Sequence, residues 1–316
     1  MEMNDFYDIV IIGGGPAGLT AGLYAARARM KALLLERVGF GGQLLTYEKV
    51  ENYPGFPEGI GAFGLGELFS AQALKFGLKT KTVDVLGLGL DVPVKTVETD
   101  AGSIPARTIV IASGASPHKL GVPGEVRYTG RGVSYCAVCD APFYRNQEVA
   151  VVGGGDTAIE EAIYLTKFAS RVYVIHRRNQ LRATSVIQEK AASNPRITLV
   201  LDTVVEDVRG NEQGVNCLSL RGTKSGEASE LHVNGVFMFV GIRPNTGFVP
   251  PSVERDPLGF IRTDQEMASS VAGVFAAGDV RAKQLRQIAT AVGDGATAAF
   301  SAGRYIEDHL SQLPVP

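Results

Sequence analysis

Apolar residues recur along this chain in an order typical of nucleotide-binding folds. A β-branched run at residues 8–12 is followed by helical spacing of apolar positions over 16–29 and by a second apolar run at 31–36. The first and last of these segments predict strands, and the middle segment predicts a helix. Together they predict one βαβ unit with two parallel strands.

The same order returns later in the chain. Residues 148–152 and 171–175 predict strands, and 157–168 predict the helix between them. The two copies of this repeat lie about 140 residues apart, and their most similar segments are VIIGGGPAG and AVVGGGDTA. A length of 316 residues leaves room for two well-packed domains, one for each copy.

The remaining segments complete the predicted architecture. Residues 83–112 alternate like antiparallel strands, and a later strand-rich stretch includes GVFMFVGI at 235–242. GVFAAGD follows at 273–279, and a last helix is expected from about 287 to 309. If that helix joins the first βαβ unit, one nucleotide-binding domain is inserted in the other. The expected α/β domains are then 1–117 with 245–316, and 118–244.

The composition is that of an ordinary globular protein and excludes some classes of function. Hydrophobic residues make up 45% of the chain and the net charge is -2, so no basic excess indicates nucleic acid. The uncharged stretch 9–26 has to be considered as a membrane span, but Gly13, Gly14, Gly15 and Pro16 would break its helix. The acidic leader lacks the positive region of a signal peptide, and a cytoplasmic protein is expected.

The first glycine-rich turn has the spacing of a dinucleotide-binding fingerprint. Gly13-x-Gly15-x-x-Gly18 directly follows a predicted strand and opens a predicted helix. The first glycine permits a tight turn, the second lets backbone approach a pyrophosphate, and the third packs helix on strand. Glu36 ends the second strand, where a carboxylate would bind a ribose 2′-hydroxyl and repel a 2′-phosphate. The turn is expected to hold FAD or NAD; the alternative is a purely structural turn.

The second fingerprint is followed by residues of the opposite charge. Gly153-x-Gly155-x-x-Ala158 has the same geometry with alanine at the packing position. Its second strand is followed by a cationic cluster suited to a 2′-phosphate, which favours NADP(H) over NAD(H). The alternative is a solvated basic loop. The cluster consists of His176, Arg177, Arg178 and Arg182.

Cys136-x-x-Cys139 could be half of a zinc site, a buried structural pair or a redox disulfide. The chain has one other cysteine and four scattered histidines, none in ligand spacing with a second pair, so no metal site is expected. Redox use is favoured. Asp140 could relay protons to a departing thiolate if burial raises its pKa, or it could be a helix cap. Cys217 is interpreted as a packing residue, and no Ser-His-Asp arrangement supports a hydrolase.

As an ordered set, these motifs resemble the low-molecular-weight, bacterial-type thioredoxin reductases, which are flavoprotein pyridine nucleotide-disulfide oxidoreductases. The resemblance covers nearly the whole chain. It is carried by GGGPAG, GGQL, VEN-x-PG, SYCAVCD, GGGDTA, HRR-x-x-x-R, FVGI-x-PN and GVFAAGD followed by Arg286-Gln287. It implies two Rossmann-like domains of the three-layer ββα type, with the NADPH domain inserted in the FAD domain, and a homodimer.

The resemblance also implies roles for individual residues. Cys139 would be the sulfur nearer the flavin, Cys136 the sulfur that attacks thioredoxin, and Asp140 the proton donor. Hydride would pass from NADPH to FAD, and electrons would then pass through the disulfide to thioredoxin. Residues expected to bind FAD are Gly13, Gly14, Gly15, Pro16, Ala17, Gly18, Glu36, Gly42, Gln43, Asn52, Gly278, Asp279, Arg286 and Gln287. Residues expected to bind NADPH are Gly153, Gly155, Asp156, Thr157, Ala158, His176, Arg177, Arg178 and Arg182.

Nicotinamide and disulfide cannot both contact one flavin ring at once. The resemblance implies that the inserted domain rotates to bring them there in turn, and hinges are expected near Pro117 and Pro244. The resemblance also implies that Arg131 and Phe143 help to dock thioredoxin. The stretch APFY after CAVCD has one aromatic fewer than many relatives, and Leu285 and Ile288 depart from the usual YRQA. The competing hypotheses are a flavin reductase with a ferredoxin-type donor or another thiol-protein acceptor, and a non-enzymatic flavin- or nucleotide-binding redox sensor.

Overall fold

The computed structural model divides the chain into two compact units. The structure describes residues 6–46, 49–90 and 94–309. The first unit is discontinuous in sequence and the second is inserted in it: the first comprises Met1–Ser116 and Arg243–Pro316, and the second Pro117–Ile242. The chain passes between the units along two short strands that pair with each other, β9 (Ala115–Pro117) and β18 (Ile242–Pro244).

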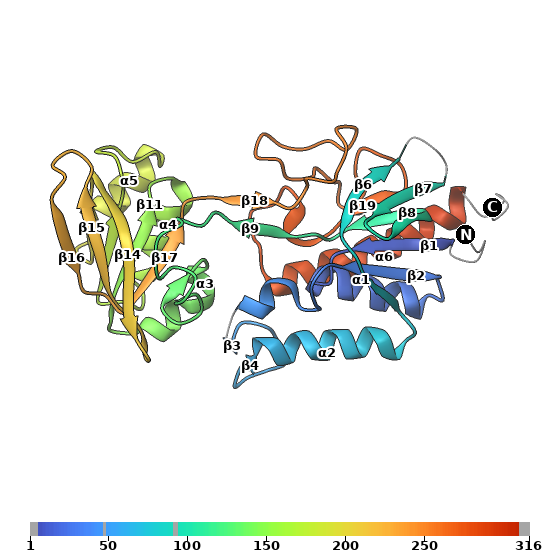
Figure 1. Ribbon diagram of the computed structural model, residues 1–316, viewed down its shortest axis with the longest axis horizontal. Helices are drawn as coiled ribbons and strands as arrows, with labels where there is room; N and C mark the ends of the chain where they lie inside the picture. Colours follow the sequence, from blue (N-terminus) through green and yellow to red (C-terminus); the bar gives the residue numbers. More distant parts are fainter. Residues whose placement is uncertain (1–5, 47–48, 91–93, 310–316) are drawn as a thin grey trace. The chain divides into compact units, whose positions relative to one another are not determined.

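A parallel sheet forms the centre of the first unit (Figure 1). Its strand order is β5-β2-β1-β8, with β19 on the other side of β8. Alternate residues of β1 serve two cores: Ile9 and Ile11 pack toward the helices, and Val10 and Ile12 pack on the opposite face. Both faces are covered, as expected for a parallel sheet. The strands are β1 (Tyr7–Ile12), β2 (Ala32–Glu36), β5 (Lys79–Thr82), β8 (Gly102–Ile111) and β19 (Val274–Ala276).

The long strand β8 continues into an antiparallel meander. Its first half pairs with β7 (Lys95–Thr99), which in turn pairs with β6 (Val85–Gly89), while its second half pairs with β1. The antiparallel strands predicted within 83–112 are thus confirmed. Two further short strands, β3 (Lys49–Val50) and β4 (Ile60–Gly61), pair antiparallel beside the first helices.

Small residues let the helices of the first unit pack closely. The helices are α1 (Pro16–Arg27), α2 (Ala62–Lys75) and α6 (Ile288–His309). A Cβ at Gly295 of α6 would collide with the backbone of Ala17 in α1, so only glycine allows this approach. Helix α1 ends two residues before the predicted position because Arg29 adopts a left-handed φ of 60°.

The second unit repeats the parallel architecture. Its sheet has the order β10-β17-β11-β12-β13, and every pairing in it is parallel. Helices α3 (Ala137–Asp140), α4 (Asp156–Leu165) and α5 (Ser185–Ala192) accompany it. The strands are β10 (Val133–Ser134), β11 (Glu148–Gly153), β12 (Arg171–Ile175), β13 (Ile197–Val200) and β17 (Gly235–Phe239). The predicted second βαβ unit, β11-α4-β12, is confirmed.

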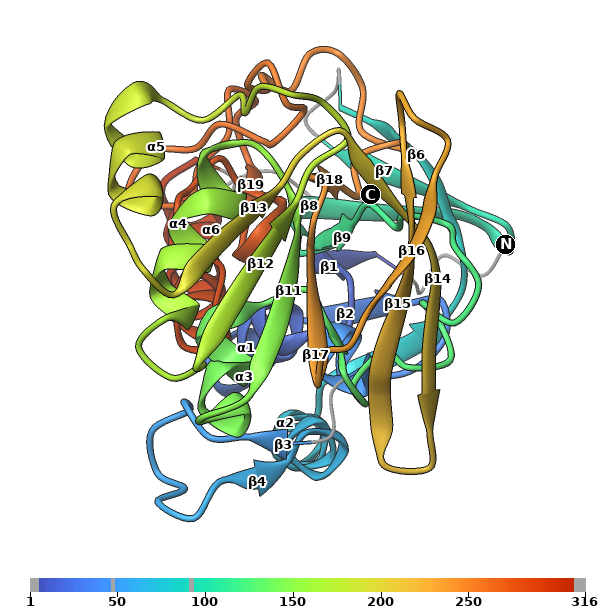
Figure 2. The ribbon, with the colours of Figure 1, turned by 90° about the vertical axis from the view of Figure 1, so that its left-hand side faces the viewer.

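A three-stranded antiparallel sheet completes the second unit. It consists of β14 (Thr203–Asn211), β15 (Gly214–Gly222) and β16 (Ala228–Leu231). Figure 2 shows this sheet on one side of the parallel strands and α4 and α5 on the other. Leu218 of β15 and Val236 of β17 share the core between the two sheets. The outer face of β14–β16 therefore carries the polar side chains.

One predicted strand is interrupted in the structure. The apolar run 235–242 forms β17 only as far as Phe239, and Gly241 has a φ of 125° before β18 begins. Within the described residues no helix is both long and apolar enough to cross a membrane. The predicted fold class, α/β with two Rossmann-like units, is confirmed.

Candidate active site

The glycine turn after β1 combines tight packing with open space. Gly13 has a φ of 110°, and a Cβ there would collide with the carbonyl of Ala112. A Cβ at Gly18 would collide with the carbonyl of Gly13, whereas one at Gly15 would meet only the Cα of Gly42, at 3.8 Å. The first and third glycines therefore close the turn, and the second leaves room beside the N-terminus of α1. Backbone N–H groups at such a terminus bind phosphates.

Glu36 lies against this turn at the end of β2. Its Oε2 accepts a hydrogen bond from Gly14 N at 2.6 Å, and its Oε1 accepts from Arg37 N at 2.7 Å and Val38 N at 3.1 Å. These backbone donors hold the carboxylate in one orientation, with lone pairs left over for a ligand. An anionic group in this position suits a ribose diol and opposes a 2′-phosphate.

A buried carboxyl group faces the same region from the C-terminal part of the chain. Asp279 belongs to the 3-10 helix η3 (Gly278–Val280), and a Cβ at Gly278 would meet Ala17 of α1 at 2.8 Å. Burial raises the pKa of Asp279, an effect that Lys283 and Arg286 oppose. Its Oδ1 is buried and has no hydrogen-bond partner among the described residues. A bound ligand with a hydroxyl or N–H group would satisfy this oxygen, so the site fits a dinucleotide.

Polar side chains predicted to bind the same cofactor are held in place by contacts with other parts of the first unit. Asn52 donates from Nδ2 to Gln287 Oε1 at 3.0 Å, and Gln43, in the 3-10 helix η1 (Gly42–Thr46), donates to Ala115 O at 2.5 Å. The guanidinium carbon of Arg286 lies 4.1 Å from the ring centroid of Phe260. Segments distant in sequence are thereby brought together within the first unit.

The second glycine turn, after β11, repeats the design. A Cβ at Gly153 would meet Ala158 Cβ and the carbonyl oxygen of Phe239, both at 2.6 Å, whereas one at Gly155 would have no described atom within 4 Å. The loop after β12 returns over this turn. Arg182 N donates to Gly154 O at 2.6 Å, and Thr184 N donates to Asp156 Oδ1 at 2.7 Å. These contacts bring Arg182 beside the open position.

The charges around this turn are cationic. Arg177, Arg178 and Arg182 are exposed and form no ion pair with any residue that the structure describes. His176 is buried beneath Gly154, and burial lowers its pKa, with the three arginines adding to the effect. The imidazole is therefore neutral at pH 7. The free guanidinium groups form a surface that fits a phosphate on the ribose.

Cys136 and Cys139 form a disulfide at the start of α3, with their Cα atoms 5.4 Å apart. Cys136 is the N-cap residue of this short helix, and its Sγ accepts a hydrogen bond from Cys139 N at 3.2 Å. A backbone donor stabilises the thiolate form of a cysteine relative to the thiol. On reduction, the hydrogen bond therefore favours a thiolate on Cys136.

Asp140 follows the disulfide in a mostly buried position. Burial raises the pKa of its carboxyl group, and a hydrogen bond from the Ser134 hydroxyl partly opposes the rise. Burial, and then the charge of Asp140, raises the pKa of Tyr144, so this phenol stays protonated. The carboxyl group is thus placed to hold a proton at higher pH than a solvated aspartate does.

Ser134, a residue not predicted from the sequence to belong to the site, contacts both Cys136 and Asp140. Its Oγ accepts from Cys136 N at 3.1 Å, and its single hydroxyl proton is shared between Cys136 O, at 3.2 Å, and the carboxyl group of Asp140. The serine stands two residues before the first cysteine in SYCAVCD, and that proximity was the available signal. Arg131 and Phe143 lie in the same unit as the disulfide, and both are exposed. Cys217 is buried in β15, and burial raises the pKa of its thiol.

Known proteins resemble this chain over nearly its full length. Residues 7–295 match the model of the family described as pyridine nucleotide-disulphide oxidoreductase. A thioredoxin reductase of Treponema pallidum is 45% identical over 305 residues, covering 96% of this chain and 99% of the relative. One of Bacillus subtilis is 42% identical, covering 98% of this chain and 97% of the relative.

A solved structure agrees with these relatives. The crystal structure of thioredoxin reductase from Streptococcus pyogenes superposes with a TM-score of 0.93 at 44% sequence identity, covering 96% of this chain and 99% of that one. Identity at this level over both chains, together with the match to the family model, is sufficient for assignment. The chain belongs to the pyridine nucleotide-disulphide oxidoreductase family and, within it, to the thioredoxin reductases.

Proposed function

We propose that this chain passes two electrons from NADPH through FAD to the Cys136–Cys139 disulfide and then to the disulfide of thioredoxin. The observation that carries the proposal is that one chain combines a CxxC disulfide with two glycine turns. The first turn lies beside the anionic Glu36, and the second lies beside a cluster of arginines. When bound, NADPH supplies a hydride and FAD relays its two electrons to a disulfide. The protein residues bind these groups, fix the thiols and supply protons.

The FAD-binding domain, proposed as residues 1–117 and 245–316, would be formed by the first unit. The open position at Gly15 and the anionic Glu36 support a pyrophosphate and a ribose without 2′-phosphate, and the unpaired Oδ1 of Asp279 supports a further polar contact. The remaining proposed FAD contacts are Gly13, Gly14, Pro16, Ala17, Gly18, Gly42, Gln43, Asn52, Gly278, Arg286 and Gln287.

The NADPH-binding domain, proposed as residues 118–244, would be formed by the second unit. Gly155 leaves room for the pyrophosphate, and Arg177, Arg178 and Arg182 supply positive charge for the 2′-phosphate. The remaining proposed contacts are Gly153, Asp156, Thr157, Ala158 and His176. Because this unit also carries the disulfide, its two strands β9 and β18 would act as hinges that let nicotinamide and disulfide reach the flavin in turn.

The thiol steps follow from the local geometry of the disulfide. The Cys136 thiolate, favoured by the N–H of Cys139, attacks one sulfur of the thioredoxin disulfide, forms a mixed disulfide and releases one thioredoxin thiolate. The Cys139 thiolate then attacks the sulfur of Cys136, restores the intramolecular disulfide and releases the second thiolate. Asp140, whose pKa is raised by burial, donates a proton to a departing thiolate.

The partner and assembly are proposed with the function. Arg131 and Phe143 are exposed in the unit that carries the disulfide and would contact thioredoxin. The exposed apolar side chains Phe63 and Leu68 of α2 support a homodimer, because such residues are common in subunit interfaces. With a disulfide that must cycle and no second cysteine pair, the cytoplasm is the proposed compartment.

The function is tested by anaerobic titration of the FAD-loaded protein with NADPH, followed by addition of oxidised thioredoxin. The wild type should lose its yellow colour with NADPH and regain it with thioredoxin. Cys139→Ser should lose its colour equally but pass no electrons to thioredoxin. A flavin that stays oxidised with NADPH would show that the donor is wrong and would favour a ferredoxin-type donor.

A further inference from the structure

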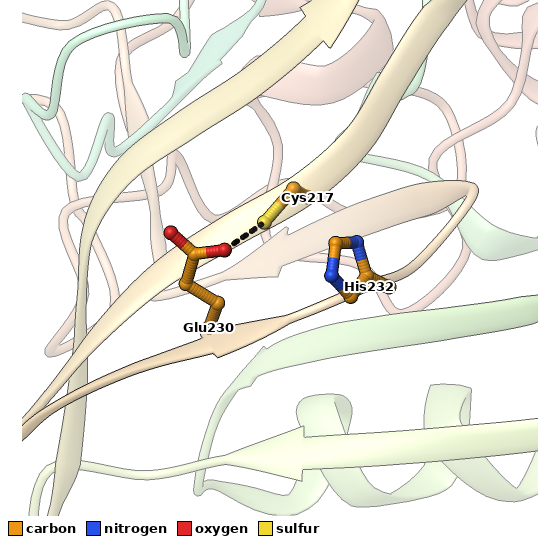
Figure 3. A group of neighbouring side chains, drawn as sticks. All are labelled: Cys217, Glu230 and His232. Carbon is orange, nitrogen blue, oxygen red and sulfur yellow. Dashed lines mark hydrogen bonds between the residues drawn. The ribbon is translucent and has the colours of Figure 1, made fainter.

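Three potential metal ligands converge on the outer face of the antiparallel sheet in the second unit. Figure 3 shows Cys217 of β15 together with Glu230 of β16 and His232 just beyond it. One ligand atom from each residue lies within 4.8 Å of the others. The register pairs Leu218 with Leu231, so Cys217 and His232 lie opposite each other and Glu230 projects from the same face.

We propose that Cys217, Glu230 and His232 bind a divalent cation of the zinc class. A thiolate, an imidazole and a carboxylate are the ligands that zinc takes in proteins. Zn–S and Zn–O bonds of about 2.3 and 2.1 Å in a tetrahedral site set a sulfur–oxygen separation of about 3.6 Å. Cys217 Sγ and Glu230 Oε2 are 3.9 Å apart, so only a small inward movement is needed.

The surrounding charges accommodate the cation. Arg209 Nη2 donates to Glu230 Oε1 at 2.7 Å, which leaves Oε2 directed at the sulfur. The same arginine lies 4.0 Å from Asp207 Oδ2. With the metal bound, two positive charges on the ion and one on Arg209 are balanced by the thiolate, Glu230 and Asp207. Arg209 would therefore orient the ligating carboxylate, as groups behind metal ligands commonly do.

The exposure of the three ligands determines whether the metal can bind water, and their protonation determines how metal affinity depends on pH. Glu230 and His232 are exposed and Cys217 is buried, so the fourth position of the metal opens to water. Binding converts the Cys217 thiol into a metal thiolate and releases its proton to solvent. Affinity should therefore rise with pH, because protons compete with the metal for its ligands.

Strand pairing explains why the site is not evident in the sequence. Cys217 and His232 lie on opposite sides of the loop that joins β15 to β16, and their spacing in the sequence matches no known zinc motif. Only the register of β15 and β16 brings them together. No metal site was expected from the sequence because only the spacing of cysteines and histidines along the chain can be judged there.

The proposal is tested with Co²⁺ as a spectroscopic probe and Zn²⁺ as competitor. The FAD-loaded protein is kept oxidised and free of added thiols, so that the Cys136–Cys139 disulfide cannot bind metal. The wild type should take up one Co²⁺ per chain, give tetrahedral bands at wavelengths beyond the flavin absorption, and lose them to Zn²⁺. Ser219→Ala, on the same face of β15, is the matched control and should behave as the wild type.

Two variants and the pH dependence decide the outcome. Cys217→Ser should abolish the tetrahedral bands, and His232→Gln should weaken binding at least tenfold, while both keep NADPH-dependent reduction of thioredoxin. Equal Co²⁺ spectra in the wild type and Cys217→Ser would overturn the proposal. A wild-type affinity that does not rise between pH 6.5 and 7.5 would also overturn it.

Discussion

At the scale of single residues, the proposed chemistry depends on a carboxyl group beside the disulfide whose pKa is raised by burial. Burial raises the pKa of Asp140, and the protonated form is the one that can donate to a departing thiolate. The reduction of thioredoxin should therefore slow as the pH rises through this raised pKa. The protein groups facing the carboxyl group are Ser134 and Tyr144, together with the adjacent cysteines.

Asp140→Asn removes the proton donor with little change in shape. Reduction of the flavin by NADPH should be unchanged, whereas electron transfer to thioredoxin should slow by about a hundredfold or more, the usual contribution of a general acid. Stopped-flow measurement of the two half-reactions separates these effects. If the variant keeps the alkaline fall in rate of the wild type, another group supplies the proton.

Ser134→Ala should change the pH profile in a defined direction. The serine hydroxyl donates a hydrogen bond that lowers the pKa of Asp140, so its removal should raise that pKa and move the alkaline fall in rate to higher pH. Ser219→Ala serves as a control remote in sequence from the disulfide. A profile that loses amplitude without moving along the pH axis would indicate only a structural role for Ser134.

At the scale of elements, the two glycine turns separate packing from ligand approach. Gly153 must be glycine because a Cβ would meet the carbonyl oxygen of Phe239, whereas Gly155 faces open space. Gly153→Ala should therefore destabilise the ligand-free fold by about 1–3 kcal/mol, the usual cost of overpacking. Gly155→Ala should leave thermal stability unchanged and raise the KM for NADPH. An equal loss of stability in both variants, measured by thermal unfolding, would contradict this division.

The arginine cluster after β12 should determine which nicotinamide cofactor is used. A hydrogen bond between charged groups contributes about 1.5–3 kcal/mol, so Arg182→Gln should raise the KM for NADPH roughly tenfold or more. The KM for NADH, which lacks the 2′-phosphate, should change little. Arg145→Gln, an exposed arginine of the same unit, is the control. A parallel rise in both KM values would place Arg182 away from the 2′-phosphate.

The periodicity of apolar residues predicted the strands and helices of both βαβ units, but it could not predict where these elements end or how other strands pair. The β1-α1-β2 and β11-α4-β12 units follow from apolar runs and glycine turns. The end of α1 depends on the left-handed conformation of Arg29, and an arginine at this position does not signal such a conformation in the sequence. The approach of Cys217 to His232 depends on strand register, and the contact of Ser134 with Asp140 depends on how α3 folds back after β10. Neither appears as a sequence motif.

At the scale of the whole molecule, the chain consists of two units joined by the paired strands β9 and β18. Each end of this connection is fixed within its own unit: His118 N donates to Gly241 O at 2.9 Å, and Asn245 N donates to Gly114 O at 3.0 Å. We therefore expect that the proposed rotation about β9 and β18 would leave the sheets of both units intact. The disulfide would accept electrons in one orientation and deliver them to thioredoxin in another.

The most direct measurement compares the two cysteines as nucleophiles toward thioredoxin. Thioredoxin with a single active-site cysteine, activated as its mixed disulfide with thionitrobenzoate, is added to Cys139→Ser and to Cys136→Ser, and release of the chromophore is followed together with intact mass. Cys139→Ser, which retains Cys136, should form the covalent complex at least ten times faster. If Cys136→Ser reacts as fast or faster, or if neither variant forms a complex, Cys136 is not the sulfur that carries electrons to thioredoxin.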